Sequence, residues 1–346
     1  MLSVALALLP VVGFLAVLFM MDSFKLVPIR AILAALVAGG LAALISLWLW
    51  SALGLHLQSG DTVSRYLAPV IEEALKSGII VFLIVRGRAG FLVDAAVQGF
   101  AVGAGFALVE NVMYLHAFGV APLTLWLVRG VGTAMLHGGT TAIFAILARA
   151  LSDRYPRRPH VAFLPGLAAA IVIHSGFNHL PLPPIVLAAV VMLVLPLMIL
   201  FVFDRSERAT REWMGAGMDL DIEVLQLVAS EHFTLTRFGQ YLQELRSRFP
   251  GIVVADMYCL LRLELELSVH ARAMIMAREA GLDLAGDEDL DASLDEREYL
   301  QRSIGKIGLL ALRPLQVTSD RDRWHRQLLA QSRRRTPGKG AGRARP

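Results

Sequence analysis

Residues 184–203 read PIVLAAVVMLVLPLMILFVF and contain no charged side chain. A helix needs about 20 mostly apolar residues to cross a lipid bilayer, so this stretch alone predicts a transmembrane helix. Similar stretches precede it along the chain. The seven predicted spans are residues 2–21, 28–50, 66–85, 91–116, 122–150, 161–180 and 184–203.

The composition divides the 346 residues into two parts. Apolar residues make up 56% of the chain and charged residues 18%, with a mean hydropathy of +0.59, whereas a soluble domain has about 45–50% and 25%. Residues 1–203 contain 11 basic residues (Lys and Arg together) and 7 acidic ones (Asp and Glu together). The remainder contains 22 basic and 22 acidic residues. We therefore expect an all-α polytopic membrane protein, with a transmembrane domain over residues 1–203. The balanced charge of the second part gives no support for nucleic-acid binding.

The loops between the predicted spans alternate in basic content. Lys25 and Arg30 follow the first span, Arg86 and Arg88 follow the third, and further basic residues follow the fifth and seventh. The opposite loops carry only Arg65. Because basic loops stay on the cytoplasmic side, we expect a multi-pass protein of the cell membrane with its N-terminus outside and its C-terminal domain in the cytoplasm.

The C-terminal part predicts a helical accessory domain over residues 204–332. Within it, residues 219–280 have the periodicity of two helices broken at residues 249–251, and residues 283–298 are rich in acids. Residues 333–346 carry six basic residues and no acids. This last segment predicts a disordered basic tail suited to contact with anionic lipid.

Ionisable and amide side chains gather inside the third to sixth spans. A charge at mid-bilayer costs about 2.5–3.5 kcal/mol even on a lenient scale, so these groups must face one another or a water-filled cavity. The sequence therefore predicts one polar site built from four helices. Its members are Glu72, Glu73 and Lys76 in the third span, Glu110 in the fourth, Arg129 and His137 in the fifth, and His174 and Asn178 in the sixth.

Depth supports a common site, with one exception. Glu72, Glu110 and His174 each lie six residues from the outer end of their spans, which is about 9 Å at 1.5 Å per residue. His137 lies fifteen residues into the fifth span, or about 22 Å. We expect His137 to join the site only if that span begins later or is broken, as its glycine content allows.

Helical spacing predicts the local partners. Lys76 is four residues after Glu72 and three after Glu73, so it can neutralise either glutamate. Spacing alone leaves open which one stays free. Arg129 is expected to be the counter-ion of a nearby glutamate.

These residues resemble the motifs of the PrsW family of intramembrane proteases. Residues 72–76 resemble its EExxK motif, and residues 106–111 resemble its FxxxEN motif. His137 and residues 174–178, HSGFN, are similar to its later His and HxxxN elements. The pattern also resembles the distantly related superfamily of CAAX prenyl proteases and bacteriocin-processing enzymes, which usually has His where this chain has Glu110.

The resemblance implies an endopeptidase that cleaves a membrane-protein substrate within or near the bilayer, such as site-one cleavage of a single-pass anti-sigma factor. Following the relatives, we expect Glu72 to be the base that activates water. Glu73 and Lys76 would orient groups and balance charge, and Asn178 would help to hold the water or polarise the carbonyl.

Two chemistries remain open for this site. In one, Glu110, His137 and His174 bind a divalent metal such as zinc, with water in the fourth position. In the other, Glu72 and the histidines act without metal. The single cysteine excludes a Cys-based zinc cluster, and no HExxH helix is present. A proton- or ion-coupled transporter and a non-enzymatic sensor are the competing functions.

Overall fold

The computed structural model describes residues 2–22, 27–52, 62–118, 122–155, 158–179, 182–280, 282, 288–312 and 314–315. These residues form helices and turns, with no strand among them, which confirms the all-α class. The chain divides into two compact units, Met1–Ala209 and Thr210–Pro346. The predicted basic tail, residues 333–346, lies outside the described part.

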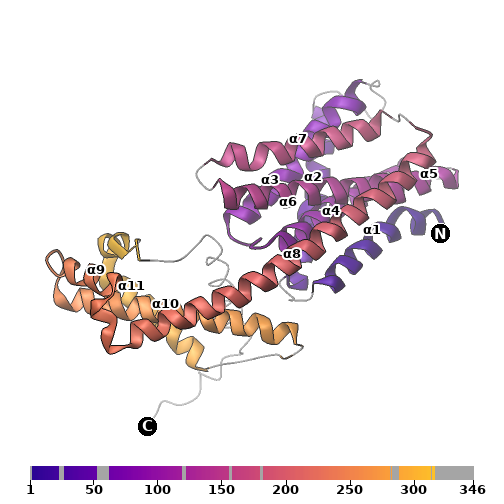
Figure 1. Cartoon of the computed structure of the whole chain (residues 1–346). Coiled ribbons are helices and arrows are strands. Elements are labelled where there is room, and N and C mark those ends of the chain that lie inside the picture. The colour runs from indigo at the N-terminus through magenta and orange to yellow at the C-terminus, as the bar shows by residue number, and fades with distance from the viewer. Residues whose placement is uncertain are drawn as a thin grey trace, which may run out of the picture. The chain divides into compact units, whose positions relative to one another are not determined.

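The helices that begin in the first unit match the predicted spans, except that the last one, α8, continues past the predicted end at Phe203 and past the end of this unit to Ala229 (Figure 1). They are α1 (Leu2–Met21), α2 (Ile29–Ala52), the π-helical turn η1 (Val63–Leu67), α3 (Ala68–Val85), α4 (Leu92–Phe118), α5 (Leu123–Leu127), the π-helical η2 (Val128–Thr133), α6 (Ala134–Arg154), α7 (Pro159–Asn178) and α8 (Pro184–Ala229).

Six helical segments of the described chain are long and apolar enough to cross a membrane, which makes this a multi-pass membrane protein. The third predicted span is not among the six. It does form a helix, α3, but its 18 residues include Glu72, Glu73 and Lys76. Those three charges lower its apolarity and are buried within the protein.

The first unit, Met1–Ala209, is called the membrane unit below. Helix α4 lies at its centre and packs against α1, α2, α3 and α6. Glycines permit the closest approaches. A Cβ at Gly39 would lie 1.9 Å from the Val102 carbonyl oxygen, and one at Gly103 would lie 2.1 Å from the His137 carbonyl oxygen. Only glycine fits such contacts. The backbones of α4 and α6 therefore meet next to His137.

The fifth predicted span forms one continuous helical segment, Leu123–Arg154, which is made up of α5, η2 and α6. The π-helical η2 carries Gly130 and Gly132, and π-helical segments inside longer helices are often found at functional sites. His137 lies in the first turn of α6, which begins at Ala134. The span is therefore continuous, and His137 lies beside Lys76 and Glu110 without the break that its depth in the span predicted.

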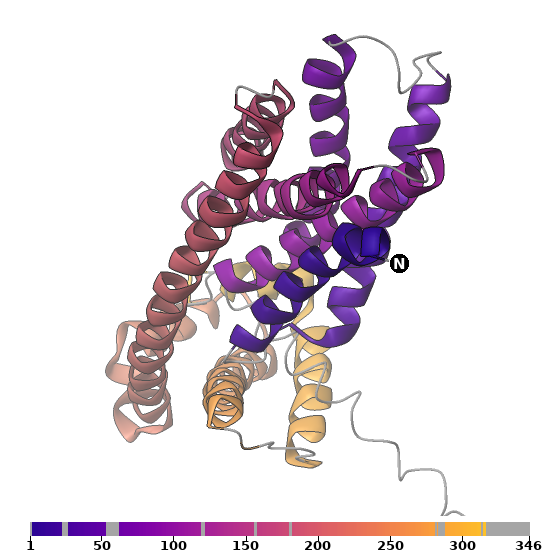
Figure 2. The same ribbon diagram turned by 90° about the vertical axis from the view of Figure 1, so that its right-hand side faces the viewer.

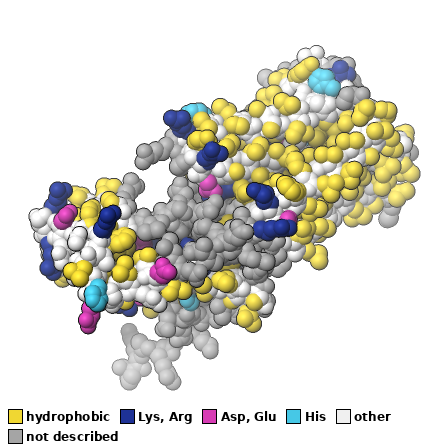
Figure 3. Space-filling model, in the orientation of Figure 1, with side chains coloured by type: hydrophobic (Ala, Val, Ile, Leu, Met, Phe, Trp, Pro, Cys, Tyr) yellow, Lys and Arg dark blue, Asp and Glu magenta, His cyan; other side chains and the backbone are white. Residues whose placement is uncertain are grey.

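The outward faces of the membrane unit are apolar. Hydrophobic side chains, drawn in yellow in Figure 3, cover the face of this unit seen in that view. The exposed side chains include Leu33 and Val37 of α2, Val172 of α7 and Leu193 of α8. Figure 2 shows the helices of this unit after a turn of 90°. Such faces suit contact with lipid.

The second unit is also helical. After α8 it contains a 3-10 turn (η3, Glu231–Leu235), α9 (Arg237–Leu245), α10 (Gly251–Glu279) and α11 (Glu288–Leu312). The predicted break at residues 249–251 is confirmed, because α10 begins at Gly251. The break after Ala229 was not predicted. A buried ion pair of 2.7 Å between Asp221 Oδ2 and Arg272 Nη1 joins α8 to α10 within this unit.

Candidate active site

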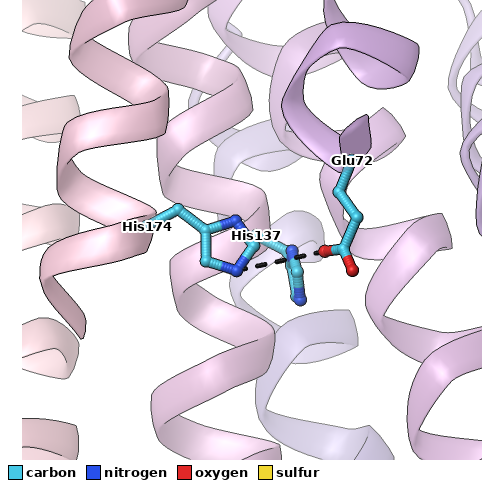
Figure 4. Close-up of side chains that lie close together, drawn as sticks. All are labelled: Glu72, His137 and His174. Atoms are coloured by element: carbon cyan, nitrogen blue, oxygen red, sulfur yellow. Dashed lines mark ion pairs between the residues drawn. The ribbon is translucent and has the colours of Figure 1, made fainter. Parts of the chain in front are cut away.

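Three side chains from three helices meet inside the membrane unit. Glu72 comes from α3, His137 from α6 and His174 from α7, and they point toward one another (Figure 4). One potential ligand atom from each lies within 4.8 Å of the other two. All three residues are buried. His174 Nε2 lies 3.9 Å from Glu72 Oε2, which is too long for a hydrogen bond.

The neighbouring carboxylate, Glu73, is neutralised and fully buried. Its Oε1 accepts hydrogen bonds from Lys76 Nζ at 2.6 Å, His174 Nδ1 at 2.8 Å and Thr140 Oγ1 at 3.2 Å. Glu73 and Lys76 both have 0% exposure. Lys76 therefore pairs with Glu73, which answers the question that spacing left open and leaves Glu72 as the glutamate without the lysine.

A second set of contacts surrounds His137. Its Nδ1 lies 3.0 Å from Lys76 Nζ, and its Nε2 lies 3.0 Å from Glu110 Oε2. Glu110 Oε1 lies 3.0 Å from Arg129 Nη2, which confirms Arg129 as the counter-ion of a nearby glutamate. The Arg129 guanidinium in turn lies 3.3 Å from the centroid of the Tyr114 ring, a cation–π contact.

The tightest group differs from the predicted ligand set in one member. It contains Glu72 with the two histidines, whereas the sequence suggested Glu110. Glu110 nevertheless lies beside His137. The site thus offers three carboxylates, Glu72 and Glu73 next to His174 and Glu110 next to His137. The individual roles of these residues remain predictions.

Asn178 does not belong to this group. Its Nδ2 donates to the Ser64 carbonyl oxygen at 2.9 Å, and Ser175 Oγ donates to the Arg65 carbonyl oxygen at 2.6 Å. Both contacts hold the π-helical turn η1, which continues directly into α3. The end of α7 is therefore tied to the start of the helix that carries Glu72.

Sequence reasoning missed Thr140 and Tyr114. Thr140 lies three residues after His137, so it shares a helical face with that histidine, and this spacing was the available signal. Tyr114 lies four residues after Glu110 and could have been found in the same way. Phe106, the first residue of the FxxxEN-like stretch, also borders the site: its ring centroid lies 5.0 Å from that of His137 and 4.9 Å from Lys76 Nζ.

The residues present fit a divalent metal ion. Imidazole nitrogens and carboxylate oxygens are the ligands of catalytic zinc, at about 2.0–2.2 Å. The 3.9 Å between His174 Nε2 and Glu72 Oε2 leaves room for an ion that both atoms could share. Three carboxyl groups and two basic side chains, Lys76 and Arg129, meet here, so the site has groups that can balance the charge of a bound cation.

A family model described as "PrsW family intramembrane metalloprotease" matches residues 27–203. That match covers more than half of the chain and includes all of the site residues, so the protein belongs to this family and is an intramembrane peptidase. No curated protein matches the chain. No solved structure matches it either.

Proposed function

We propose that the chain hydrolyses a peptide bond of a single-pass membrane protein, with Glu72 as the base that activates water. The observation that carries this proposal is that the two adjacent glutamates have different partners. Lys76 neutralises Glu73 at 2.6 Å, while Glu72 faces His174. A carboxylate that lacks its own cation can accept a proton from the attacking water and pass it to the leaving amine.

The contacts of His174 support a defined imidazole form. Its Nδ1 lies 2.8 Å from Glu73 Oε1, so Nδ1 carries the proton and the Nε2 lone pair faces Glu72. Metal-ligating histidines usually donate their other ring N–H to a carboxylate in this way. Glu73 therefore orients His174, and Lys76 balances the charge of Glu73.

The two histidines would hold the metal, together with a carboxylate oxygen from Glu72 or Glu110. When bound, a divalent ion of this kind polarises the substrate carbonyl and lowers the pKa of water. In the described structure both nitrogens of His137 have partners, Lys76 Nζ and Glu110 Oε2. Ligation by His137 therefore requires one of these contacts to be exchanged.

The resemblance and the family suggest the finer assignment. We propose that the substrate is a single-pass membrane protein such as an anti-sigma factor, cut at a first site near the outer face. The polar group would then lie in the outer half of the bilayer, with the N-terminus outside and residues 204–332 forming a cytoplasmic accessory domain. The end of α7, with Asn178, would keep η1 and α3 in register with His174.

Replacing Glu72 by Gln tests the function. We expect Glu72→Gln to fold normally and to lose cleavage by at least about 100-fold, the lower range for removing a general base. Single-pass membrane proteins that accumulate in cells with this variant identify the substrate, and their cleavage by purified enzyme is the measurement. The exposed Glu231→Gln is the matched control. Full proteolysis by Glu72→Gln would rule out Glu72 as the base.

Metal dependence is tested on the same preparations. We expect a chelator to abolish cleavage and Zn²⁺ to restore it, because the buried donor set suits a divalent ion. Elemental analysis of Glu72→Gln separates the two roles of this residue: zinc retained supports a base, and zinc lost makes Glu72 a ligand. Cleavage that resists exhaustive chelation, in protein without bound metal, contradicts the metal chemistry.

A further inference from the structure

Helix α6 carries two adjacent threonines in the first turns after its start. Thr140 and Thr141 both have 0% exposure. They follow His137 by three and four residues, so both hydroxyls can reach back to its carbonyl oxygen. The two threonines are therefore equally buried, but their partners differ.

Thr141 has a local partner. Its Oγ1 donates to the His137 carbonyl oxygen at 2.8 Å. Thr140 Oγ1 lies 3.3 Å from that same oxygen and 3.2 Å from Glu73 Oε1 on α3. A hydroxyl has one proton to donate, and a carboxylate accepts more strongly than a carbonyl that is already bonded. Thr140 therefore donates to Glu73.

This donation connects three helices at one oxygen atom. Glu73 Oε1 receives Lys76 from its own helix α3, Thr140 from α6 and His174 from α7. Lys76 also contacts His137 Nδ1 at 3.0 Å. Thr140 is the group that ties the carboxylate to the helix of His137 without adding charge. The position of Glu73 then decides which nitrogen of His174 carries the proton.

We propose that Thr140 is a positioning residue of the active site, acting through Glu73 to present His174 Nε2 for metal binding. It touches neither the substrate nor the ion. This inference rests on one part of the proposed function, namely that His137 and His174 bind a divalent metal. It adds that one neutral hydroxyl sets the affinity of the site for that metal.

The test compares two substitutions one residue apart. Thr140→Val and Thr141→Val each replace a buried hydroxyl by a methyl group of similar volume, and Thr140→Ser keeps the hydroxyl. For each full-length protein in detergent we would measure Zn²⁺ affinity against a competing indicator, thermal stability without metal, and cleavage.

We expect Thr140→Val to lower Zn²⁺ affinity by about 10–100-fold, the usual effect of losing a group that orients a ligand. Thr140→Ser and Thr141→Val should bind like the unsubstituted protein. Thermal stability without metal should fall more in Thr140→Val than in Thr141→Val, because a hydrogen bond to a carboxylate is stronger than one to a carbonyl, and Thr140→Ser should keep the stability of the unsubstituted protein. If Thr140→Val does not fold, Thr140→Ala removes the same hydroxyl without the branched side chain.

Equal Zn²⁺ affinity of Thr140→Val and Thr141→Val overturns the proposal, as does a lack of Zn²⁺ binding by the unsubstituted protein. Failure of the proposed function has a different signature. In that case Glu72→Gln keeps its proteolytic activity, whereas the Zn²⁺ comparison does not involve peptide hydrolysis.

Discussion

At the scale of single residues, the site is organised by which acid pairs with which base. Glu73 pairs with Lys76 and Glu110 pairs with Arg129, so the two fixed cations each serve one of the three glutamates. Glu72 has His174 opposite it at 3.9 Å. Because its neighbour is a histidine and not a lysine or arginine, Glu72 is the glutamate that we propose exchanges a proton during the reaction.

Removing Arg129 tests this pairing. Arg129→Met leaves Glu110 without its cation, and breaking a buried pair costs about 3–5 kcal/mol. The side chains are 12% and 20% exposed, so we expect the loss of stability to fall near or below the lower end of that range. The measurement is thermal unfolding in detergent, with Arg208→Met of the exposed pair to Asp204 as the control. Equal melting of the two variants would contradict a structural role for the Arg129 pair.

At the scale of helices, close backbone approach places the chemistry. Helix α4 lies against α6 where Gly103 faces the His137 carbonyl oxygen. The close approach at Gly103 therefore involves the backbone of His137, a proposed metal ligand. A small residue at this point lets two helices carry their polar groups into one narrow site.

Gly103→Ala should disrupt that approach. A Cβ would lie 2.1 Å from the His137 carbonyl oxygen, so the helices must separate. We expect destabilisation by about 1–3 kcal/mol or more, as for overpacked cores, together with loss of cleavage. Gly78→Ala is the matched control because nothing lies within 4 Å of its Cβ. Thermal unfolding and cleavage are measured for both. A Gly103→Ala protein as stable and active as Gly78→Ala would show that α4 and α6 need not be this close.

At the scale of the whole molecule, the proposed orientation makes residues 204–332 cytoplasmic. The chain has one cysteine, Cys259, and it is exposed within α10. It therefore reports the side of the membrane on which the second unit lies. Partial burial, and then the negative charges of Asp256 and Glu296, raise the pKa of the Cys259 thiol. Since the thiolate is the reactive form, labelling accelerates as the pH rises.

We expect a membrane-impermeant maleimide to leave Cys259 unlabelled in intact cells and to label it in inverted vesicles. The comparison should be made at a mildly alkaline pH, because the raised pKa slows the reaction at neutral pH. Cys259→Ser is the control for background labelling. Labelling of intact cells equal to that of inverted vesicles would reverse the proposed orientation.

The sequence by itself determined the helices and most of the polar residues that lie together inside the first unit. Apolar runs of about 20 residues define spans because unpaired backbone groups are too costly in lipid. Charges inside those runs must converge for the same energetic reason. The boundaries of α1 and the break before Gly251 followed from such local patterns.

Only the tertiary structure decided the pairings. Lys76 can reach either glutamate along α3, and it lies on Glu73 because His174 and Thr140 from other helices hold that carboxylate. His137 joins the site although the fifth span is one continuous helical segment, with a π-helical stretch at η2. Asn178 donates a hydrogen bond to the Ser64 carbonyl oxygen of η1. Each outcome depends on contacts between helices that are far apart in sequence. Helical periodicity describes the faces of one helix and does not give the distances between helices.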